Sequence, residues 1–293
     1  FTITVANTND APVFTSTPTT SAVEDAGYSY TAAASDIDVG DNLTYAAPTL
    51  PGWLTFDVAT QILSGTPLND DVGTHEVVLS VTDLEGATAG QLFTISVSNT
   101  NDAPVFTSVP IEEATEDTGY SYTMVAGDVD DGDELTYTAQ ALPGWLTFDG
   151  ATTISGTPTN DNVGDHAVVL LVTDNFGLTA EQSFTISVAN TNDAPVFTST
   201  PTTSSIEDAG YSYTVTASDV DVDDTMEITG THPAWLTLTD NGGGTAQLSG
   251  TPTNDDVGDH SVVLTVSDGF VTVNQEFTIT VANTNDAPVF TST

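Results

Sequence analysis

The chain repeats one eight-residue stretch, Asn-Thr-Asn-Asp-Ala-Pro-Val-Phe, at positions 7–14, 99–106, 190–197 and 283–290. Each copy follows an alternating apolar run, and its proline cannot continue a strand ladder, so the stretch is typical of a joint between modules. The aspartates Asp10, Asp102, Asp193 and Asp286 are separated by 92, 91 and 93 residues. This period is too long for a solenoid repeat and fits a small domain.

The repeat divides the 293 residues into three complete modules and two partial ones. We expect the complete modules at 11–102, 103–193 and 194–286. Residues 1–10 would be the last strand and linker of a preceding module, and residues 287–293 the first strand of a following one. The first seventeen residues are identical to the last seventeen, so we expect a segment of a longer array. The orphan strand at 1–5 would fray or pair with a neighbouring chain.

Charge limits the possible partners. The chain carries 42 Asp and Glu residues and no Lys or Arg, a formal net charge of −42. It cannot neutralise phosphates, which excludes nucleic acid and anionic membrane surfaces as partners. Such a chain repels itself when compact, so the compensating charge must come from mobile cations or bound metal ions. For acids outside the clusters described below, a solvated surface suited to a salty environment is the alternative interpretation.

The remaining composition is that of a globular chain. Hydrophobic residues make up 38%, which argues against disorder despite the charge. Modules of this size outside the cell are commonly stabilised by disulfides or by metal ions. The chain has no cysteine, so of these two only metal ions remain. No apolar run approaches membrane-spanning length, and we expect no membrane insertion.

Short alternating strands separated by turn signals predict the fold. In the first complete module, strands are expected at 28–32, 43–46, 61–63, 75–82 and 92–97, with a short edge strand starting at 12–15. No stretch has an apolar pattern of helical period with caps. The sequence therefore predicts an all-β chain of tandem Greek-key β-sandwiches of immunoglobulin-like architecture, arranged end to end.

Internal repetition shows which acids keep their position while their neighbours vary. Four sets correspond between modules: Glu24, Glu116 and Glu207; the pairs Asp36/Asp38, Asp128/Asp130 and Asp219/Asp221; Asp70, Asp161 and Asp255; and Asp83, Asp174 and Asp268. Carboxylates at i and i+2 lie on the same side of an extended segment and repel each other unless a cation lies between them. The available ligands are hard oxygens, which favours calcium over zinc, copper or iron; magnesium, which prefers rigid octahedral geometry, fits less well.

Several motifs resemble a known family. The repeated stretch resembles the interdomain linker of cadherin repeats, and residues 36–42 (DIDVGDN) are similar to their DxDxGxN motif. Residues 53–57 (WLTFD), 64–67 (SGTP) and 69–73 (NDDVG) resemble the dystroglycan-type cadherin-like, or putative-Ig, modules of large bacterial surface proteins and adhesins. The resemblance covers every complete module. It implies cadherin-like sandwiches at the cell surface, with calcium ions between successive domains that stiffen the array.

The resemblance also implies which side chains would hold calcium at each joint. The joint between the first two modules would use Glu24, Asp70, Asn99, Asn101, Asp102, Asp128, Asp130 and Asp174. The next joint would use Glu116, Asp161, Asn190, Asn192, Asp193, Asp219, Asp221 and Asp268. Ahead of the first module, Asn7, Asn9 and Asp10 would pair with Asp36, Asp38 and Asp83. After the third module, Glu207, Asp255, Asn283, Asn285 and Asp286 would form the upstream half of a further joint.

The sequence departs from the cadherin pattern in three places. Each linker begins with Asn where cadherins have Asp, and the cadherin DRE motif has only a loose counterpart at 69–71 (NDD). Fewer charges at each joint predict fewer ions or weaker binding. The third module carries Asp223 and Thr225 where the DxDxGxN motif has Gly and Asn, so its motif departs furthest.

Two other features suggest different functions. The tryptophan of each module (Trp53, Trp145, Trp235) could stack on sugars, but its apolar flanks favour a core position. One histidine recurs before the penultimate strand of each module (His75, His166, His260), with no Ser or Cys arrangement beside it, and is expected to start that strand, while His232 stands alone before Pro233. Two carboxylates could form a glycosidase pair. However, an active site is rarely copied in every module of an array, whereas a structural joint must be, so we expect no enzyme.

The sequence thus favours a calcium-stiffened, non-catalytic extender segment of a large secreted bacterial surface protein or adhesin. Its partners would be calcium and the neighbouring modules of the same chain. The alternative is a set of modules that bind extracellular polysaccharide or associate laterally with other copies, including the subunit of a filament or surface layer. The polysaccharide alternative predicts exposed aromatic side chains on a sandwich face.

Overall fold

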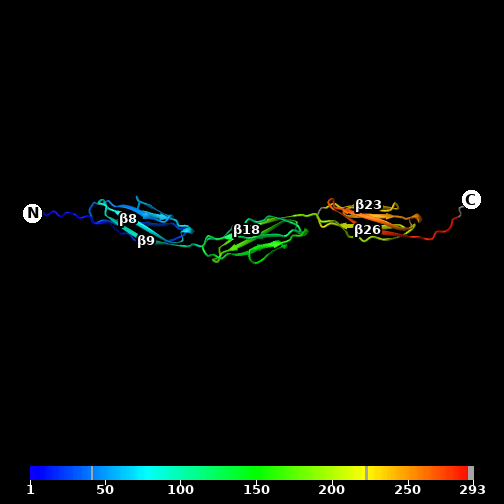
Figure 1. The fold of residues 1–293 in the computed structure, drawn as a ribbon, viewed down its shortest axis with the longest axis horizontal. Coiled ribbons are helices and arrows are strands. Elements are labelled where there is room, and N and C mark those ends of the chain that lie inside the picture. Colours follow the sequence, from blue (N-terminus) through cyan, green and yellow to red (C-terminus); the bar gives the residue numbers. More distant parts are fainter. Residues whose placement is uncertain (41, 222–223, 290–293) are drawn as a thin grey trace.

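The computed structural model describes residues 1–40, 42–221 and 224–289. Asp41 and Asp223 of the predicted motifs, and residues 290–293, lie outside the described residues. The three modules follow one another along one long axis, with the two chain termini at opposite ends (Figure 1). The chain is therefore an elongated array, in which consecutive modules meet only end to end.

The first module consists of nine short β-segments in two packed sheets. They are β1 (Val13–Phe14), β2 (Ser21–Val23), β3 (Tyr28–Thr31), β4 (Ala34–Ser35), β5 (Thr44–Thr49), β6 (Leu54–Asp57), β7 (Ile62–Gly65), β8 (Gly73–Thr82) and β9 (Thr88–Ser98). One sheet has the order β2-β9-β8-β5, and the facing layer contains β3-β7-β6 and the pair β1-β4. Strands β2 and β9, the first and last of the larger sheet in sequence, run parallel, with Ala22 opposite Val97.

The second module repeats this arrangement. Its segments are β10 (Val105–Phe106), β11 (Glu113–Thr115), β12 (Tyr120–Thr123), β13 (Ala126–Gly127), β14 (Thr136–Ala141), β15 (Leu146–Phe148), β16 (Thr153–Gly156), β17 (Gly164–Thr173) and β18 (Thr179–Ala189). The larger sheet again has a parallel pair, β11 with β18, beside the β17–β18 hairpin.

The third module differs in one sheet. Its segments are β19 (Val196–Phe197), β20 (Ser204–Ile206), β21 (Tyr211–Ser218), β22 (Glu227–Thr231), β23 (Leu236–Gly242), β24 (Thr245–Gly250), β25 (Gly258–Ser267) and β26 (Thr272–Ala282). Because the β23–β24 hairpin is longer, β24 also pairs with Val215 and Thr216. The strand that is split into β3 and β4 in the first module is therefore continuous here, and this sheet has the order β19-β21-β24-β23.

The structure confirms the all-β sandwich architecture and adds elements that the sequence did not predict. Strand β2 lies outside the strands predicted for this module; its three residues form a strand through pairing with the distant β9. Strand β6 and the single 3₁₀ turns Asn69–Asp71, Asn160–Asn162 and Asn254–Asp256 were also missed. Among the described residues, no helix is long and apolar enough to cross a membrane. Residues 1–10 contain no strand, since an alternating pattern forms a strand only with a ladder partner.

Alternating side chains build one core in each module. In β8, Val77, Leu79 and Val81 are fully buried, while the intervening residues are half-buried, as the two-residue period of a strand requires. The Trp53 ring packs against this core and meets the Tyr28 ring edge to face at 5.7 Å. The other two modules repeat this tryptophan–tyrosine contact. The expected core position of the tryptophans is confirmed.

One buried tyrosine of each module is predicted to titrate late. The hydroxyls of Tyr28, Tyr120 and Tyr211 each donate a 2.7 Å hydrogen bond to a backbone carbonyl oxygen. Burial, and then the neighbouring tyrosine, raise the pKa of each from 10.0 to about 12. The pKa of each tyrosine is thus higher in the folded state than in the unfolded state. The contribution of the neutral tyrosine to folding stability is therefore fully present below the unfolded-state pKa and is lost as pH rises towards the folded-state pKa.

We therefore expect three of the eight tyrosines to ionise near the alkaline unfolding transition when phenolate absorbance is followed in the folded protein. Tyr120→Phe should reduce this late class to two. The substitution should also lower the stability of the second module by about 1 kcal/mol, since the carbonyl oxygen loses its donor. Ionisation of all the tyrosines in a single step near their ordinary pKa would contradict this assignment.

Candidate metal centres

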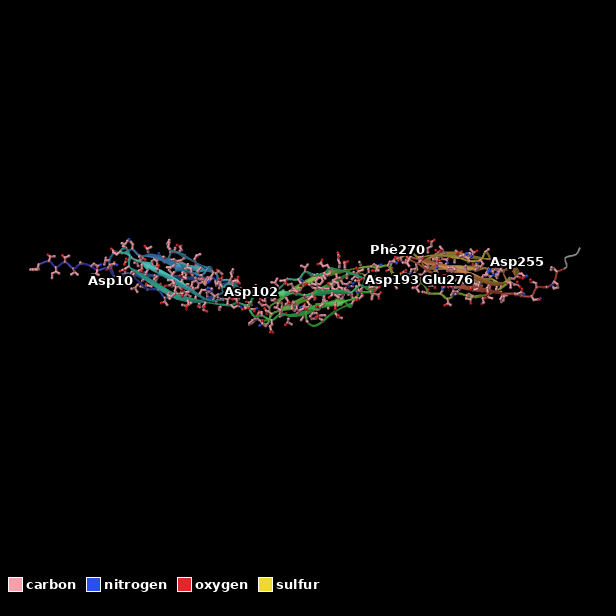
Figure 2. All side chains as sticks on the ribbon, in the orientation of Figure 1. Asp10, Asp102, Asp193, Asp255, Phe270 and Glu276 are labelled. Atoms are coloured by element: carbon pink, nitrogen blue, oxygen red, sulfur yellow. The ribbon has the colours of Figure 1, made fainter. Side chains whose placement is uncertain are left out.

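Every buried charged or polar residue in the described part of the chain is a carboxylate from the predicted ligand set. These residues are Glu24, Asp83, Glu116, Asp130, Asp174, Glu207, Asp221 and Asp268. Burying a carboxylate is costly unless a cation or hydrogen-bond donors compensate its charge. The chain has no Lys or Arg, and these carboxylates accept hydrogen bonds from backbone N–H groups and asparagine side-chain amides. Figure 2 places Asp102 and Asp193 at the two narrow connections between modules.

Asp130 lies at the centre of the joint between the first and second modules. It follows β13 and is only 6% exposed. Its Oδ1 accepts hydrogen bonds from Asn99 Nδ2 at 2.8 Å and from Asn69 Nδ2 at 3.1 Å, and its Oδ2 accepts one from the backbone N–H of Asp102 at 2.6 Å. One carboxylate of the second module thus contacts both the linker and the body of the first module.

Asp174 connects the same linker to the β17–β18 turn. Its Oδ2 accepts a hydrogen bond from Asn101 Nδ2 at 2.8 Å, while its Oδ1 accepts three backbone N–H groups, from Phe176, Gly177 and Leu178. Burial acts to raise the pKa of Asp174, but the hydrogen bonds from Asn101 and from the turn outweigh it and hold the pKa below its usual value. Asp174 therefore carries negative charge at the joint at neutral pH.

A tight group of carboxylates surrounds Asp130. Oxygens of Asp128, Asp130 and Asp133 lie within 4.8 Å of one another. Asp128 accepts the backbone N–H of Asp130 with Oδ1, and its buried Oδ2 has no hydrogen-bond partner. Burial, and then the charges of Asp128, Asp130 and Asp174, raise the pKa of Asp133. The negative charge here is concentrated, and a cation would relieve it.

A second group joins the upstream module to the linker. Oxygens of Glu24, Asp25 and Asp102 lie within 4.8 Å of one another. Glu24 is 3% exposed and accepts the backbone N–H of Thr100 at 3.1 Å. Burial, and then the charge of Asp130, raise the pKa of Asp102. The two groups share the linker, so this joint has two acidic positions.

The joint between the second and third modules repeats these contacts around Asp221. Asp221 accepts hydrogen bonds from Asn160 Nδ2 at 2.8 Å and from the backbone N–H of Asp193 at 2.7 Å. The Asp193 bond, and then one from Asn190, hold the pKa of Asp221 below its usual value. Asn192 Nδ2 donates to Asp268 at 3.0 Å. The tight groups are Glu116, Asp193 and Asp221, and Asp219, Asp221 and Asp224.

The two outer linkers form half of this arrangement. Ahead of the first module, Asn7 Nδ2 donates to Asp38 at 2.6 Å and Asn9 Nδ2 to Asp83 at 2.9 Å, while Asp36 accepts the backbone N–H of Asp38. After the third module, Glu207 accepts the backbone N–H of Thr284. Three predicted ligands there are exposed: Asn283, Asn285 and Asp286.

The third set of predicted acids lies apart from the tight groups. Asp70, Asp161 and Asp255 are exposed. Asp70 lines a cavity of about 540 Å³ at the first joint, together with Asn69 and Asp130. Sequence reasoning missed Asn69 and Asn160, the side chains that cross the two joints, and Asp25, Asp133 and Asp224. Comparing 69–71, 160–162 and 254–256 between modules would have revealed the first two, because each of these triplets begins with Asn.

The oxygen atoms at the joints are suitable ligands for a hard divalent cation. Six buried side-chain oxygens in the described residues lack a hydrogen-bond partner: Asp36 Oδ2, Asn101 Oδ1, Asp128 Oδ2, Glu207 Oε2, Asp219 Oδ2 and Asp224 Oδ2. All six belong to residues at joints. Carboxylate and amide oxygens of this kind are the ligands that calcium takes in proteins, and a buried acceptor without a donor requires some partner.

Comparisons with known proteins agree with the fold. The "Serine-rich adhesin for platelets" of Staphylococcus aureus strain MRSA252 is 34% identical over 129 residues, which are 44% of this chain and 9% of the adhesin. The chain thus spans a small part of that relative. The extracellular domain of protocadherin gamma B4 matches over 93% of this chain and 49% of its own, with 20% identity and a TM-score of 0.55. Cadherin domains 1–4 of protocadherin gamma B7 match over 92% and 76%, with 17% identity and a TM-score of 0.53.

The protocadherin likenesses support cadherin-like sandwiches in tandem. The Putative Ig domain family matches residues 11–98, 103–189 and 194–282, one match for each sandwich. The chain therefore belongs to the Putative Ig domain family, as three tandem cadherin-like modules.

Proposed function

We propose that this chain is a non-catalytic spacer of an extracellular adhesin-type protein, and that calcium at its joints stiffens it. One observation carries the proposal: in a chain without Lys or Arg, every buried charged side chain of the described residues is a carboxylate at a joint. The acids of an active site would be expected in one module only, whereas the buried carboxylates recur in all three modules.

Different residues of each joint would bind calcium and hold the linker in place. Between the first two modules, Asp128, Asp130 and Asp174 would supply carboxylate oxygens from the downstream side, and Asn101 the unpartnered oxygen of the linker. Calcium would supply the positive charge that the chain itself lacks. Asp102 would hold the linker between the two sides, because its backbone N–H already donates to Asp130. The joint would then resist bending, since neither module could rotate without separating these oxygens.

The matched adhesin supports the adhesin-type context, and the protocadherin likeness supports end-to-end use of the modules. The sugar-platform alternative is less well supported. The tryptophans are half-buried and packed edge to face, and apart from Phe1 the exposed aromatic side chains of the described residues, Phe176 and Phe270, lie in strand-connecting turns rather than on a sheet face. Figure 2 shows Phe270 at the end of the third module that lies nearest Asp193.

Calcium removal tests the proposal. Small-angle scattering and thermal unfolding would be measured with millimolar calcium, with equal magnesium, and with chelator at matched ionic strength. Calcium is expected to increase the maximum dimension and the melting temperature beyond the effect of added salt, because screening alone does not order a joint. Affinity should lie around 10⁻⁴ to 10⁻³ M, as in other extracellular modules. Identical length and melting temperature with calcium and with chelator would refute the proposal.

A further inference from the structure

Each module holds one histidine against the 3₁₀ turn that precedes it. His75 Nε2 lies 2.6 Å from the backbone oxygen of Asp71, the last residue of the turn Asn69–Asp71. His166 and His260 make the same contact, also at 2.6 Å, with Asn162 and Asp256. A carbonyl oxygen only accepts hydrogen bonds, so Nε2 carries the hydrogen in all three rings.

The histidine ring also contacts the core. The ring centroids of His75 and Trp53 are 6.0 Å apart in an edge-to-face arrangement, and the other two modules repeat this contact at 5.9 Å. Trp53 in turn packs against the buried cluster of its module. Each histidine therefore connects the turn to the hydrophobic core of its module.

The turn presents a side chain to the next module. Asn69, its first residue, donates its side-chain amide to Asp130 across the joint at 3.1 Å, and Asn160 donates to Asp221 at 2.8 Å. The histidine holds the carbonyl oxygen two residues further along the same turn. Within the turn, the backbone N–H of Val72 donates to the Asn69 oxygen at 3.1 Å, so the two ends of the turn move together.

We propose that His75 and His166 are positioning residues for the joints: by pinning the 3₁₀ turn to the core, each fixes the asparagine that bonds the next module's central aspartate. The proposal deepens the stiffening function proposed above and rests on it for its role in calcium binding. The hydrogen bond between the asparagine and the aspartate joins two protein groups without a cation. It therefore restricts movement at the joint even before calcium is added.

The third module provides a matched control within the chain. His260 makes the same contacts with its turn and its tryptophan as the other two histidines. Asn254, the counterpart of Asn69, is exposed, and its side chain has no hydrogen-bond partner among the described residues. Replacing His260 therefore removes the intramodular contact without touching either of the two complete joints.

The test measures joint flexibility by distance distributions between spin labels. The chain has no cysteine, so single cysteines can be placed at the exposed residues Glu76, Glu181 and Glu276. Glu76→Cys with Glu181→Cys spans the first joint, and Glu181→Cys with Glu276→Cys spans the second. Each pair is combined with His75→Phe or with His260→Phe, which keep a ring against the tryptophan but remove the donor. All samples are measured in chelator and in calcium.

His75→Phe is expected to broaden the distribution across the first joint only, in both buffers, and to raise the calcium concentration needed to narrow it. Each of the two substitutions should lower the melting temperature of its own module, by similar amounts. His260→Phe should leave both distance distributions unchanged. Equal distributions for His75→Phe and His260→Phe would overturn the proposal. If calcium narrows no distribution in the parent protein, the stiffening function fails, and the comparison in chelator still decides the role of the histidine.

A second pair of variants covers the case in which His75→Phe does not fold. Asn69→Ala removes the donor that crosses the joint and leaves the histidine contact intact. It should broaden the first joint without lowering the melting temperature of the first module, while Asn254→Ala should change neither. An unchanged first joint in Asn69→Ala would overturn the proposal.

Discussion

Gly156→Ala is expected to destabilise the second module strongly while the first and third keep their stability. Gly156 ends β16, and a Cβ built there would lie 2.0 Å from the backbone oxygen of Trp145 and 3.3 Å from Cα of Leu146. Neither neighbour is the end of a flexible side chain, so the β15–β16 pairing would have to open. We expect a loss of about 3 to 5 kcal/mol, most of the stability of a small domain.

Calorimetry would show this loss as a separate, earlier transition for one third of the chain. Since 1 kcal/mol shifts the midpoint of a domain of this size by about 4 to 8 °C, the second module should melt more than about 12 °C below the others. Gly144→Ala is the matched control, because a Cβ there has nothing within 4 Å, and the third module already carries Ala234 at this position. A melting profile equal to that of Gly144→Ala would contradict the prediction.

Asp102→Asn is expected to change stability in opposite directions with and without calcium. Without the ion, the substitution removes a carboxylate whose pKa is raised by burial and then by Asp130, Asp25 and Asp128, so it should stabilise the first joint. With the ion, it removes a ligand charge and should weaken binding at that joint tenfold or more, about 1.4 kcal/mol for each tenfold change. The calcium-dependent gain in melting temperature would shrink accordingly.

Calcium titration followed by calorimetry and scattering would measure both effects. Glu76→Gln is the control, because it removes the same charge from an exposed position within β8, away from the tight carboxylate groups. It should leave the calcium dependence unchanged. A loss of stability for Asp102→Asn in chelator as large as in calcium would show that Asp102 acts through its hydrogen-bonding and packing alone.

The fold could be predicted where neighbouring residues determine it. Val77, Leu79 and Val81 alternate along β8, and the structure buries all three, because a strand in a two-layer sandwich has one inward face. Strand β2 has no such pattern. It forms because Ser21, Ala22 and Val23 meet Ser96, Val97 and Ser98 of β9, a pairing over more than seventy positions that local sequence does not encode.

The candidate sites divide in the same way. Internal repetition identified all eight buried carboxylates as candidate ligands, because these acids occupy the same position in every module while their neighbours vary. It did not identify which residue of each Asn-Asp-Asp or Asn-Asp-Asn turn faces the joint. A 3₁₀ turn has about three residues per turn, so successive side chains point roughly 120° apart and only one of them can face the neighbouring module. The structure places Asn69 and Asn160 there, and leaves Asp70 and Asp161 exposed.

The parallel pairing of β2 with β9 has a mechanical consequence. The chain enters each sandwich near one of these strands and leaves through the other, so tension applied along the array pulls the two strands past each other in shear. The ladder bonds, which include Ser96 N–H to Thr20 O and Glu24 N–H to Ser98 O, both at 3.0 Å, are then loaded together rather than one after another. The side chain of Gln91 adds a further bond, to Ser16 O at 2.9 Å. Resistance to pulling is thereby distributed along the whole strand pair of every module.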